Sequence, residues 1–166
     1  MDKMDYIIAP VSKEDADAVI GIFNYYVENS FAAFPEEPVP HQFFDLLVKV
    51  SACYPFLVAK DGEGTVLGFA LLRPHNPMPV FSRTAEIACF ISPEQIGKGL
   101  GSAMQDVLLH EARDKGISSI LAGISSLNSA SVAFHKKRGF LECGRFQKIG
   151  RKWGQDFDVV WMQKMI

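Results

Sequence analysis

Three closely spaced glycines between a predicted strand and a predicted helix constrain the fold of this chain most. Gly97, Gly99 and Gly101 follow a strand-like run at 84–91 and lead into residues 100–115, whose apolar positions recur with helical spacing. Glycine allows conformations that other residues resist, so main-chain N–H groups can crowd toward a ligand. A helix start adds unpaired N–H donors and partial positive charge. The segment predicts a pyrophosphate-like anion site, with a plain glycine turn as the alternative.

The spacing of these glycines excludes two common nucleotide-binding motifs. A P-loop needs a Gly-Lys pair followed by Ser or Thr, whereas Lys98 lies between glycines here. A dinucleotide fingerprint needs its third glycine one position later than Gly101, and it normally opens the fold instead of following four strands. The predicted anion site is therefore neither a P-loop nor a dinucleotide-binding fingerprint.

Hydrophobic periodicity predicts an α/β fold in which helices flank one central sheet. The 166 residues suit one domain, and 48% apolar with 22% charged residues suit a soluble globule with its own core. No linker or internal repeat divides the chain, so we expect a single domain over residues 1–166. Strands are predicted at 6–10, 56–60, 66–72, 84–91, 120–124, 140–149 and 157–165, and helices at 12–30, 41–52, 100–115 and 128–138.

Composition argues against several functional classes. Lys and Arg number 17 against 19 Asp and Glu, a formal charge of −2, which disfavours nucleic-acid binding through bulk positive charge. No apolar run approaches the roughly 18 residues that span a bilayer. Residues 1–10 carry two acids and do not resemble a secretory signal. We expect a cytoplasmic protein with no membrane or nucleic-acid partner.

Cysteine and histidine spacing argues against a disulfide framework or a metal centre. Cys53, Cys89 and Cys143 are odd in number and widely separated, without a CxxC pair. The four histidines show no HExxH-like spacing. We expect no bound metal, and three small buried thiols in a reducing cytoplasm.

A second group of polar residues lies about thirty residues after the glycines. Asn128 follows the predicted strand at 120–124 and opens a short helix. Its amide can both donate and accept hydrogen bonds, as is needed to hold a peptide-like chain. His135 lies seven residues later, two helical turns along and on the same face. A surface or packed histidine is the alternative to a functional one.

Together the two groups resemble the GNAT acetyltransferase superfamily. Its acetyl-CoA loop follows the pattern (Arg/Gln)-x-x-Gly-x-(Gly/Ala), which Ile96–Gly101 matches except at Ile96. Its downstream Asn-x-x-Ala-x-x-x-Tyr-x-x-x-Gly-Phe run corresponds to Asn128–Phe140, with Ser131 in the alanine place and His135 in the tyrosine place. The resemblance implies an acyl-CoA N-acyltransferase fold, with a mostly antiparallel central sheet flanked by helices, and acetyl-CoA as cosubstrate.

The whole chain is also similar to the phosphinothricin/methionine-sulfone N-acetyltransferase branch of that superfamily. The matching segments include 22–27, 34–38, Ala85-Glu86 and the ending 150–161, which unrelated glycine turns do not imitate. This branch implies a small amino-acid-like acceptor with a primary amine, and a homodimer built in part from the terminal strands. The loop 72–82 departs from the branch's aromatic-rich version, which leaves the identity of the acceptor open.

Residue roles follow from the same resemblance. Glu86 is the candidate base that takes a proton from the amine, and the alternative is an acid on a solvated strand face. His135 is the candidate acid, or hydrogen-bond partner, for the departing thiolate. Main-chain N–H groups around Phe90–Ile91 are candidates for oxyanion stabilisation. We expect direct transfer within a ternary complex, without an acetyl-cysteine at Cys89.

The resemblance also implies two sets of contacts. Because Ile96 stands in the Arg/Gln place, backbone donors, helped by Gln95 or Lys98, would hold the diphosphate. Acetyl-CoA is expected to contact Cys89, Phe90, Ile91, Ile96, Gly97, Lys98, Gly99, Leu100, Gly101, Ser102, Asn128 and His135. The acceptor is expected to contact Phe31, Phe34, Arg73, Phe81 and Glu86. Arg73 would grip a carboxylate through two hydrogen bonds, with a surface or dimer contact as its alternative. Core packing is the alternative for each aromatic residue.

Two other functions stay open at this point. Acetylation of a protein N-terminus or lysine would need an open groove, whereas the Pro-rich segments 31–40 and 73–79 favour the walls of a small pocket. A non-catalytic acetyl-CoA-binding module would not need both Glu86 and His135, and both are present. The leading prediction is a small-molecule N-acetyltransferase.

Overall fold

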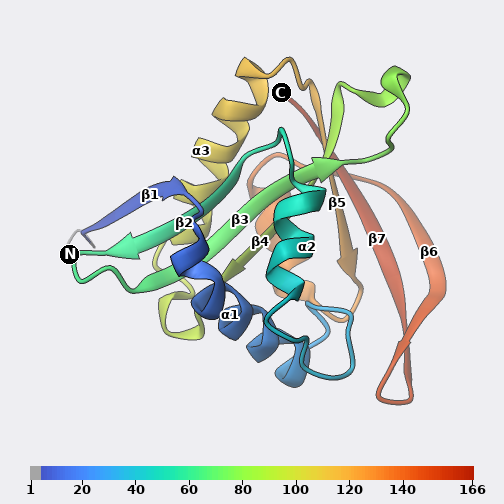
Figure 1. The fold of residues 1–166 in the computed structure, drawn as a ribbon. Coiled ribbons are helices and arrows are strands. Elements are labelled where there is room, and N and C mark those ends of the chain that lie inside the picture. The colour runs from blue at the N-terminus through green and yellow to red at the C-terminus, as the bar shows by residue number, and fades with distance from the viewer. Residues whose placement is uncertain (1–4) are drawn as a thin grey trace.

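The computed structural model describes residues 5–166, which fold as one mixed sheet with helices on both faces (Figure 1). Within this range the strands lie in the order β1-β2-β3-β4-β5-β7-β6, and neighbours are antiparallel except for the parallel pair β4 and β5. The predicted α/β class and mostly antiparallel sheet are confirmed. Residues 1–4, part of the segment considered as a secretory signal, lie outside the described residues.

The observed elements follow the predicted order along the chain. The strands are β1 (Tyr6–Pro10), β2 (Phe56–Asp61), β3 (Val66–Pro74), β4 (Thr84–Ile91), β5 (Ser119–Ser125), β6 (Leu141–Lys152) and β7 (Gln155–Met165). The helices are α1 (Ala16–Asn29), α2 (Phe43–Val50), α3 (Leu100–Asp114) and α4 (Ser129–Lys137). Ser12 marks the start of the first helical segment, because its N–H donates to Asp15 Oδ2 at 2.9 Å in a capping arrangement.

Different helices cover the two faces of the sheet. On one face, Val19 and Val27 of α1 share a buried cluster with Phe69 of β3. On the other face, Met104 of α3 shares a second buried cluster with Leu72 of β3. Side chains alternate along a strand, so the central strands contribute to both clusters. The helices therefore stand on opposite sides of any opening in the sheet.

Such an opening lies between β4 and β5, which pair over their first residues and then separate. The parallel register joins Thr84–Glu86 to Ser119–Leu121, but β4 continues to Ile91 and β5 to Ser125. Each strand keeps its other neighbour, β3 for β4 and β7 for β5. The inner edges of the two strands are therefore available to line a cleft.

The β6–β7 hairpin is longer than periodicity predicted, and its turn lies against the segment that follows α1, where Phe31 packs on Trp153. Trp153 and Gly154 have φ values of 50° and 76°, as a two-residue type I′ turn requires. The strands therefore run on to Lys152 and resume at Gln155. The predicted strand ends at 149 and 157 are wrong because this tight turn needs two residues.

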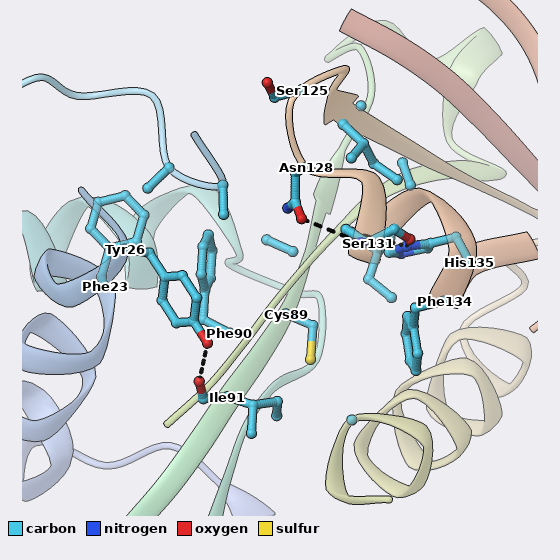
Figure 2. Close-up of a pocket in the computed structure, with 18 of the residues that line it drawn as sticks. Phe23, Tyr26, Cys89, Phe90, Ile91, Ser125, Asn128, Ser131, Phe134 and His135 are labelled. Carbon is cyan, nitrogen blue, oxygen red and sulfur yellow. Dashed lines mark hydrogen bonds between the residues drawn. The ribbon is translucent and has the colours of Figure 1, made fainter. Parts of the chain in front are cut away.

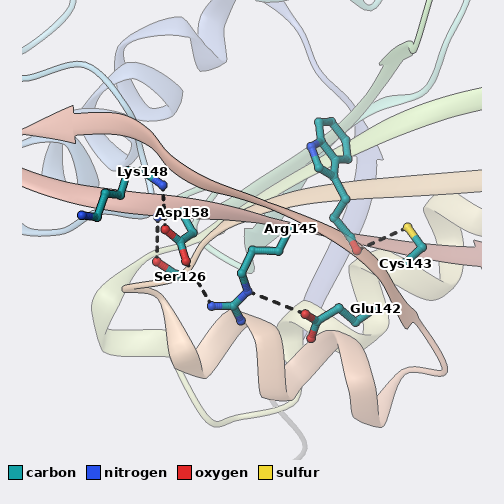
Figure 3. Close-up of polar contacts among 7 residues, drawn as sticks. Ser126, Glu142, Cys143, Arg145, Lys148 and Asp158 are labelled. Atoms are coloured by element: carbon teal, nitrogen blue, oxygen red, sulfur yellow. Dashed lines mark hydrogen bonds and ion pairs between the residues drawn. The ribbon is translucent and has the colours of Figure 1, made fainter.

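A bulge in β6 is held by Asp158 of β7 (Figure 3). The pairing register shifts between Phe146 and Gly150. Within this interval the Lys148 N–H donates to Asp158 Oδ1 at 2.8 Å, while Arg145 Nη1 lies 3.4 Å from Asp158 Oδ2. The carboxylate thus satisfies a main-chain donor that the irregular strand leaves outside the ladder.

The three cysteines are free thiols, but the expected burial is wrong for two of them. Cys53 and Cys143 are exposed, whereas Cys89 is partly buried. Cys53 has a φ of 69° in the turn after α2. Cys143 lies on β6, the last strand of the described sheet, whose side chains are mostly exposed.

Residues 5–166 contain neither a membrane-spanning helix nor a metal-binding cluster. No helix in this range has both the length and the apolar character needed to cross a bilayer. No group of three His, Cys, Asp or Glu side chains in the same range is gathered closely enough to hold a metal ion.

Candidate active site

A cleft of about 910 Å³ opens where β4 and β5 separate (Figure 2). Strand β4 divides the cleft, because its side chains alternate between the two faces of the sheet. We call the part toward residues 95–102 and α4 the loop side, and the part toward α1 and α2 the aromatic side. Ile87, Cys89 and Ile91 face the loop side, whereas Glu86, Ala88 and Phe90 face the aromatic side.

On the loop side, the glycine loop presents main-chain donors. Gly97 and Gly99 have φ values of 80° and 85°, and a Cβ built at either would meet no atom within 4 Å. In the described chain, no protein acceptor faces the N–H groups of Leu100–Ser102, because the first bond of α3 runs from Ala103 to Gly99. Free donors beside open space fit the diphosphate of a coenzyme.

Side chains of the loop contribute less than its backbone. Ile96 lines the cleft, but its side chain is 60% exposed and carries no polar group. The Lys98 side chain does not line the cleft, and its Nζ lies 3.4 Å from Oε1 of Gln95. Gln95 does line the cleft, so it is the better placed of the two expected helpers.

Strand geometry selects which N–H groups of β4 face the cleft. The Ser92 N–H donates to the Leu67 carbonyl on the β3 side at 2.9 Å. The direction of the N–H groups alternates along a strand, so the Phe90 N–H also points to β3, while those of Cys89 and Ile91 point into the cleft. The candidate oxyanion donors are therefore Cys89 and Ile91, and Phe90 contributes its ring instead.

Two ionisable side chains beside these donors stay protonated. Burial raises the pKa of the Cys89 thiol to about 12, and the thiol is a poor nucleophile in that form. The Tyr26 hydroxyl donates to the Ile91 carbonyl, and burial raises the pKa of Tyr26 to about 12 (Figure 2). Neither group is suited to carry the acetyl group.

Asn128 and His135 lie on the α4 wall of the cleft (Figure 2). Asn128 Oδ1 accepts from the Ser131 N–H at 3.3 Å and caps α4, which leaves the amide NH₂ as a donor. His135 Nδ1 lies 2.8 Å from the Ser131 carbonyl oxygen. A carbonyl can only accept, so Nδ1 carries the proton and Nε2 is the acceptor. Burial lowers the pKa of His135 below its ordinary value, which favours a neutral hydrogen-bond partner over an acid.

Glu86 lies where β4 and β5 separate, and two neighbours hold its carboxylate. Arg73 lies opposite it in the β3–β4 register, with Nη2 and Nε 2.7 and 3.1 Å from Oε2. His75 Nδ1 lies 3.0 Å from Oε1. The Glu86 side chain is 14% exposed, so it lines the cleft and not a solvated face. The Arg73 guanidinium, expected to grip a carboxylate of the acceptor, is already paired with Glu86.

The aromatic side is a chamber lined mostly by rings. The Phe23 ring lies 5.3 Å from those of Phe43 and Phe90, and the Phe69 and Phe90 rings lie 5.4 Å apart. Most of the remaining lining residues here are apolar, namely Ala32, Ala33, Phe34, Pro35, Leu47, Val50, Leu71 and Ala88. Among the described residues, Arg73 and Glu86 are the charged pair of the cleft lining.

Three expected site residues lie outside the cleft lining. Phe31 packs against Trp153 and Phe157, with ring centroids 5.4 and 6.0 Å apart. Phe81 lies on the loop that follows β3. Lys98, the third of these residues, lies in the glycine loop, but its side chain does not line the cleft. The cleft lining does include Phe34, Arg73, Glu86, Cys89, Phe90, Ile91, Ile96, Gly97, Gly99, Leu100, Gly101, Ser102, Asn128 and His135.

Sequence reasoning missed several residues of the site. His75, Tyr26 and Trp161 come from three distant parts of the chain; Tyr26 and Trp161 lie in the matching segments 22–27 and 150–161 without a predicted role, and His75 lies in none of those segments. The one available signal was that His75 lies two residues after Arg73, which places both on one face of an extended segment. Their meeting with Glu86 depends on the β3–β4 register.

Comparison with known sequences identifies the family. The model of the acetyltransferase (GNAT) family matches residues 19–140. The L-methionine sulfoximine/L-methionine sulfone acetyltransferase of Pseudomonas aeruginosa is 34% identical over 153 residues, which are 90% of this chain and 88% of that protein. Both matches include the glycine loop and the α4 segment.

Solved structures agree with the sequence comparison. A GNAT superfamily phosphinothricin acetyltransferase from Sinorhizobium meliloti, in complex with AcCoA, has a TM-score of 0.91 at 26% identity, covering 98% of this chain and 89% of that one. A ribosomal-protein-alanine N-acetyltransferase from Brucella melitensis has a TM-score of 0.89 at 31% identity, and the match covers 96% of this chain and 99% of that one. The chain therefore belongs to the GNAT family, as an N-acetyltransferase that takes its acetyl group from acetyl-CoA.

Proposed function

We propose that this enzyme acetylates the primary amine of a small amino-acid-like acceptor, by direct transfer while both substrates are bound. The observation that carries the proposal is the position of Glu86, which faces the aromatic side at the last β4–β5 pair, beside the opening that leads to the loop side. A donor held by the glycine loop and an acceptor in the aromatic chamber would both reach this carboxylate. The relatives named for methionine sulfone and phosphinothricin support the acceptor class.

Each polar group of the cleft then has a distinct task. Bound acetyl-CoA supplies the activated acyl carbon. An amine of this kind titrates near ~10, so Glu86 accepts its proton, directly or through one water. The N–H groups of Cys89 and Ile91 stabilise the negative charge that develops on the carbonyl oxygen. The C–S bond then breaks, the departing thiolate takes the second amine proton, and His135 Nε2 accepts a hydrogen bond from the resulting CoA thiol.

The charge distribution of the cleft restricts the acceptor further. Glu86 engages Nε and Nη2 of Arg73, which leaves Nη1 for a single carboxylate. A second anionic group would have to lie among the rings of Phe23, Phe43 and Phe90, where desolvation is costly. An amino acid with an apolar side chain therefore fits the chamber best.

An acceptor screen tests this function. We expect kcat/KM for methionine and phenylalanine to exceed that for phosphinothricin by at least about tenfold, which corresponds to about 1.4 kcal/mol. Thiol release with free amino acids and with short peptides is the measurement. Turnover with peptides alone would favour protein acetylation, and acetyl-CoA binding without any turnover would favour a binding module.

The glycine loop gives a second prediction. Gly99→Ala places a Cβ on a residue with φ 85°, which costs about 1–2 kcal/mol and shifts the N–H groups at the start of α3. We expect acetyl-CoA affinity to fall about tenfold, measured by calorimetry. Gly21→Ala in α1, whose φ is not positive and whose surroundings are open, is the matched control. Unchanged affinity in Gly99→Ala would contradict diphosphate binding by this loop.

We also propose a homodimer and a cytoplasmic location. The outer edge strand β6 exposes Leu141, Phe146 and Ile149, by 75%, 57% and 59%, which is a typical composition for the core of a subunit interface. Three free thiols suit a reducing compartment.

A further inference from the structure

His75 lies between the buried carboxylate of Glu86 and solvent. It follows the last residue of β3, and its N–H lies 3.4 Å from the Thr84 carbonyl at the start of β4. Nδ1 lies 3.0 Å from Glu86 Oε1, and the imidazole side chain is 37% exposed against 14% for Glu86. The rings of Phe81 and Trp161 lie edge-to-face with the imidazole, with centroids 6.1 and 6.5 Å from that of His75.

The proposed reaction leaves a proton on Glu86 in every turnover. That proton has to leave before the next amine can be activated. Arg73 contacts the other carboxylate oxygen, but a guanidinium stays protonated in proteins and has no acceptor site. Among residues 5–166, His75 is the other side chain that contacts the carboxylate, and a neutral imidazole has a free acceptor nitrogen.

We propose that His75 carries the proton from Glu86 to solvent; this inference rests on the proposed function, in which Glu86 is the base. The O–H bond of the Glu86 carboxyl breaks as an N–H bond forms at His75 Nδ1, which regenerates the carboxylate. The imidazolium then loses its Nε2 proton to water or buffer. Exchange with water then moves the remaining proton from Nδ1 to Nε2 of the exposed ring, and Nδ1 becomes an acceptor again.

The surroundings of His75 suit this task. The charged groups that share its hydrogen-bond network are the Glu86 carboxylate on β4 and the Arg73 guanidinium on β3, while Phe81 and Trp161 bring uncharged rings. Imidazole is the side chain that changes charge between about pH 5 and 8, so one ring can both take and release a proton.

Two substitutions separate proton transfer from positioning. His75→Asn keeps an amide donor near the place of Nδ1 and can hold Glu86, but it cannot carry a proton. His75→Phe keeps an aromatic ring beside Phe81 and Trp161, but it can neither hold Glu86 by a hydrogen bond nor carry a proton. His110→Asn is the matched control, because His110 is exposed on α3, 3.6 Å from Asp114 and away from the cleft.

The measurement is kcat and KM from about pH 6 to about pH 9, with and without free imidazole. We expect both His75 variants to lose about ten- to a hundredfold in kcat with unchanged KM for acetyl-CoA, and imidazole to restore several-fold of this loss. The His110→Asn variant and the parent enzyme should not respond to imidazole.

Other outcomes overturn the relay in distinguishable ways. A parent-like kcat in His75→Asn, or loss without imidazole rescue, would reduce His75 to a positioning or structural residue while leaving the proposed function intact. An unchanged kcat in Glu86→Gln would remove both the base and the relay. Absence of turnover with every amine would remove the reaction itself and the relay with it.

Discussion

Glu86→Gln is expected to lower kcat by about 10²–10⁴-fold, the usual contribution of a positioned general base. Glutamine has the same shape but cannot accept the proton that the ammonium must lose. Acetyl-CoA affinity should stay within about twofold, because Glu86 lies on the aromatic side of β4 and the glycine loop on the other side. Steady-state kinetics and calorimetry on the same preparation measure the two quantities.

A matched control keeps this test specific. Glu63→Gln changes an exposed acid in the β2–β3 turn, far from the cleft lining, and should leave both kcat and affinity unchanged. Arg73 is more than half exposed, so losing its ion pair with Glu86 should affect stability little. A kcat for Glu86→Gln equal to that of Glu63→Gln would exclude Glu86 as the base.

Lys152→Met is expected to lower the free energy of unfolding by about 3 kcal/mol, or Tm by about 6–12 °C. Lys152 is 1% exposed, and its Nζ donates to the carbonyls of Val27, Ser30 and Ala33 at 2.7, 2.8 and 2.8 Å. These three acceptors match the three N–H bonds of an ammonium group, and two of them lie at the C-terminal end of α1. Methionine fills the space but leaves the carbonyls without a donor.

The same substitution should also affect the acceptor. Ala33 lines the aromatic side, so releasing its carbonyl should loosen that wall and raise KM for the amine. Lys49→Met, at an exposed position on α2, is the control and should change stability by less than about 0.5 kcal/mol. Thermal unfolding of the two variants measures the difference. If Lys152→Met lowers the free energy of unfolding by less than about 1 kcal/mol, the three hydrogen bonds of Lys152 do not stabilise the fold as expected.

Local chemistry made parts of this protein predictable. The positive φ of Gly97 and Gly99 and the free N–H groups at the start of α3 follow from glycine and from helix geometry, whatever the rest of the fold does. The Asn128 cap and the position of His135 on the same helix follow from a spacing of seven residues. The helix and strand order was confirmed for the same reason, since periodicity is a local property.

Contacts between distant segments were not predictable in this way. Phe31, expected in the acceptor pocket, packs instead against the β6–β7 hairpin, whose two-residue turn was not recognised. Cys143 was expected to be buried, yet β6 is an edge strand, and edge position depends on sheet order. The direction of the Phe90 N–H group depends on which neighbour β4 pairs with at each position.

The sequence by itself determined the glycine loop, the α4 cap and the presence of Glu86 in a strand before that loop, because each depends on neighbours within a few residues. The tertiary structure decided what surrounds Glu86. The antiparallel register of β3 and β4 sets Arg73 and His75 on its carboxylate, and the separation of β4 from β5 opens the cleft beside it. A strand can pair with many segments that are distant in sequence. The pairing observed is the one favoured by the buried area and hydrogen bonds of the whole sheet.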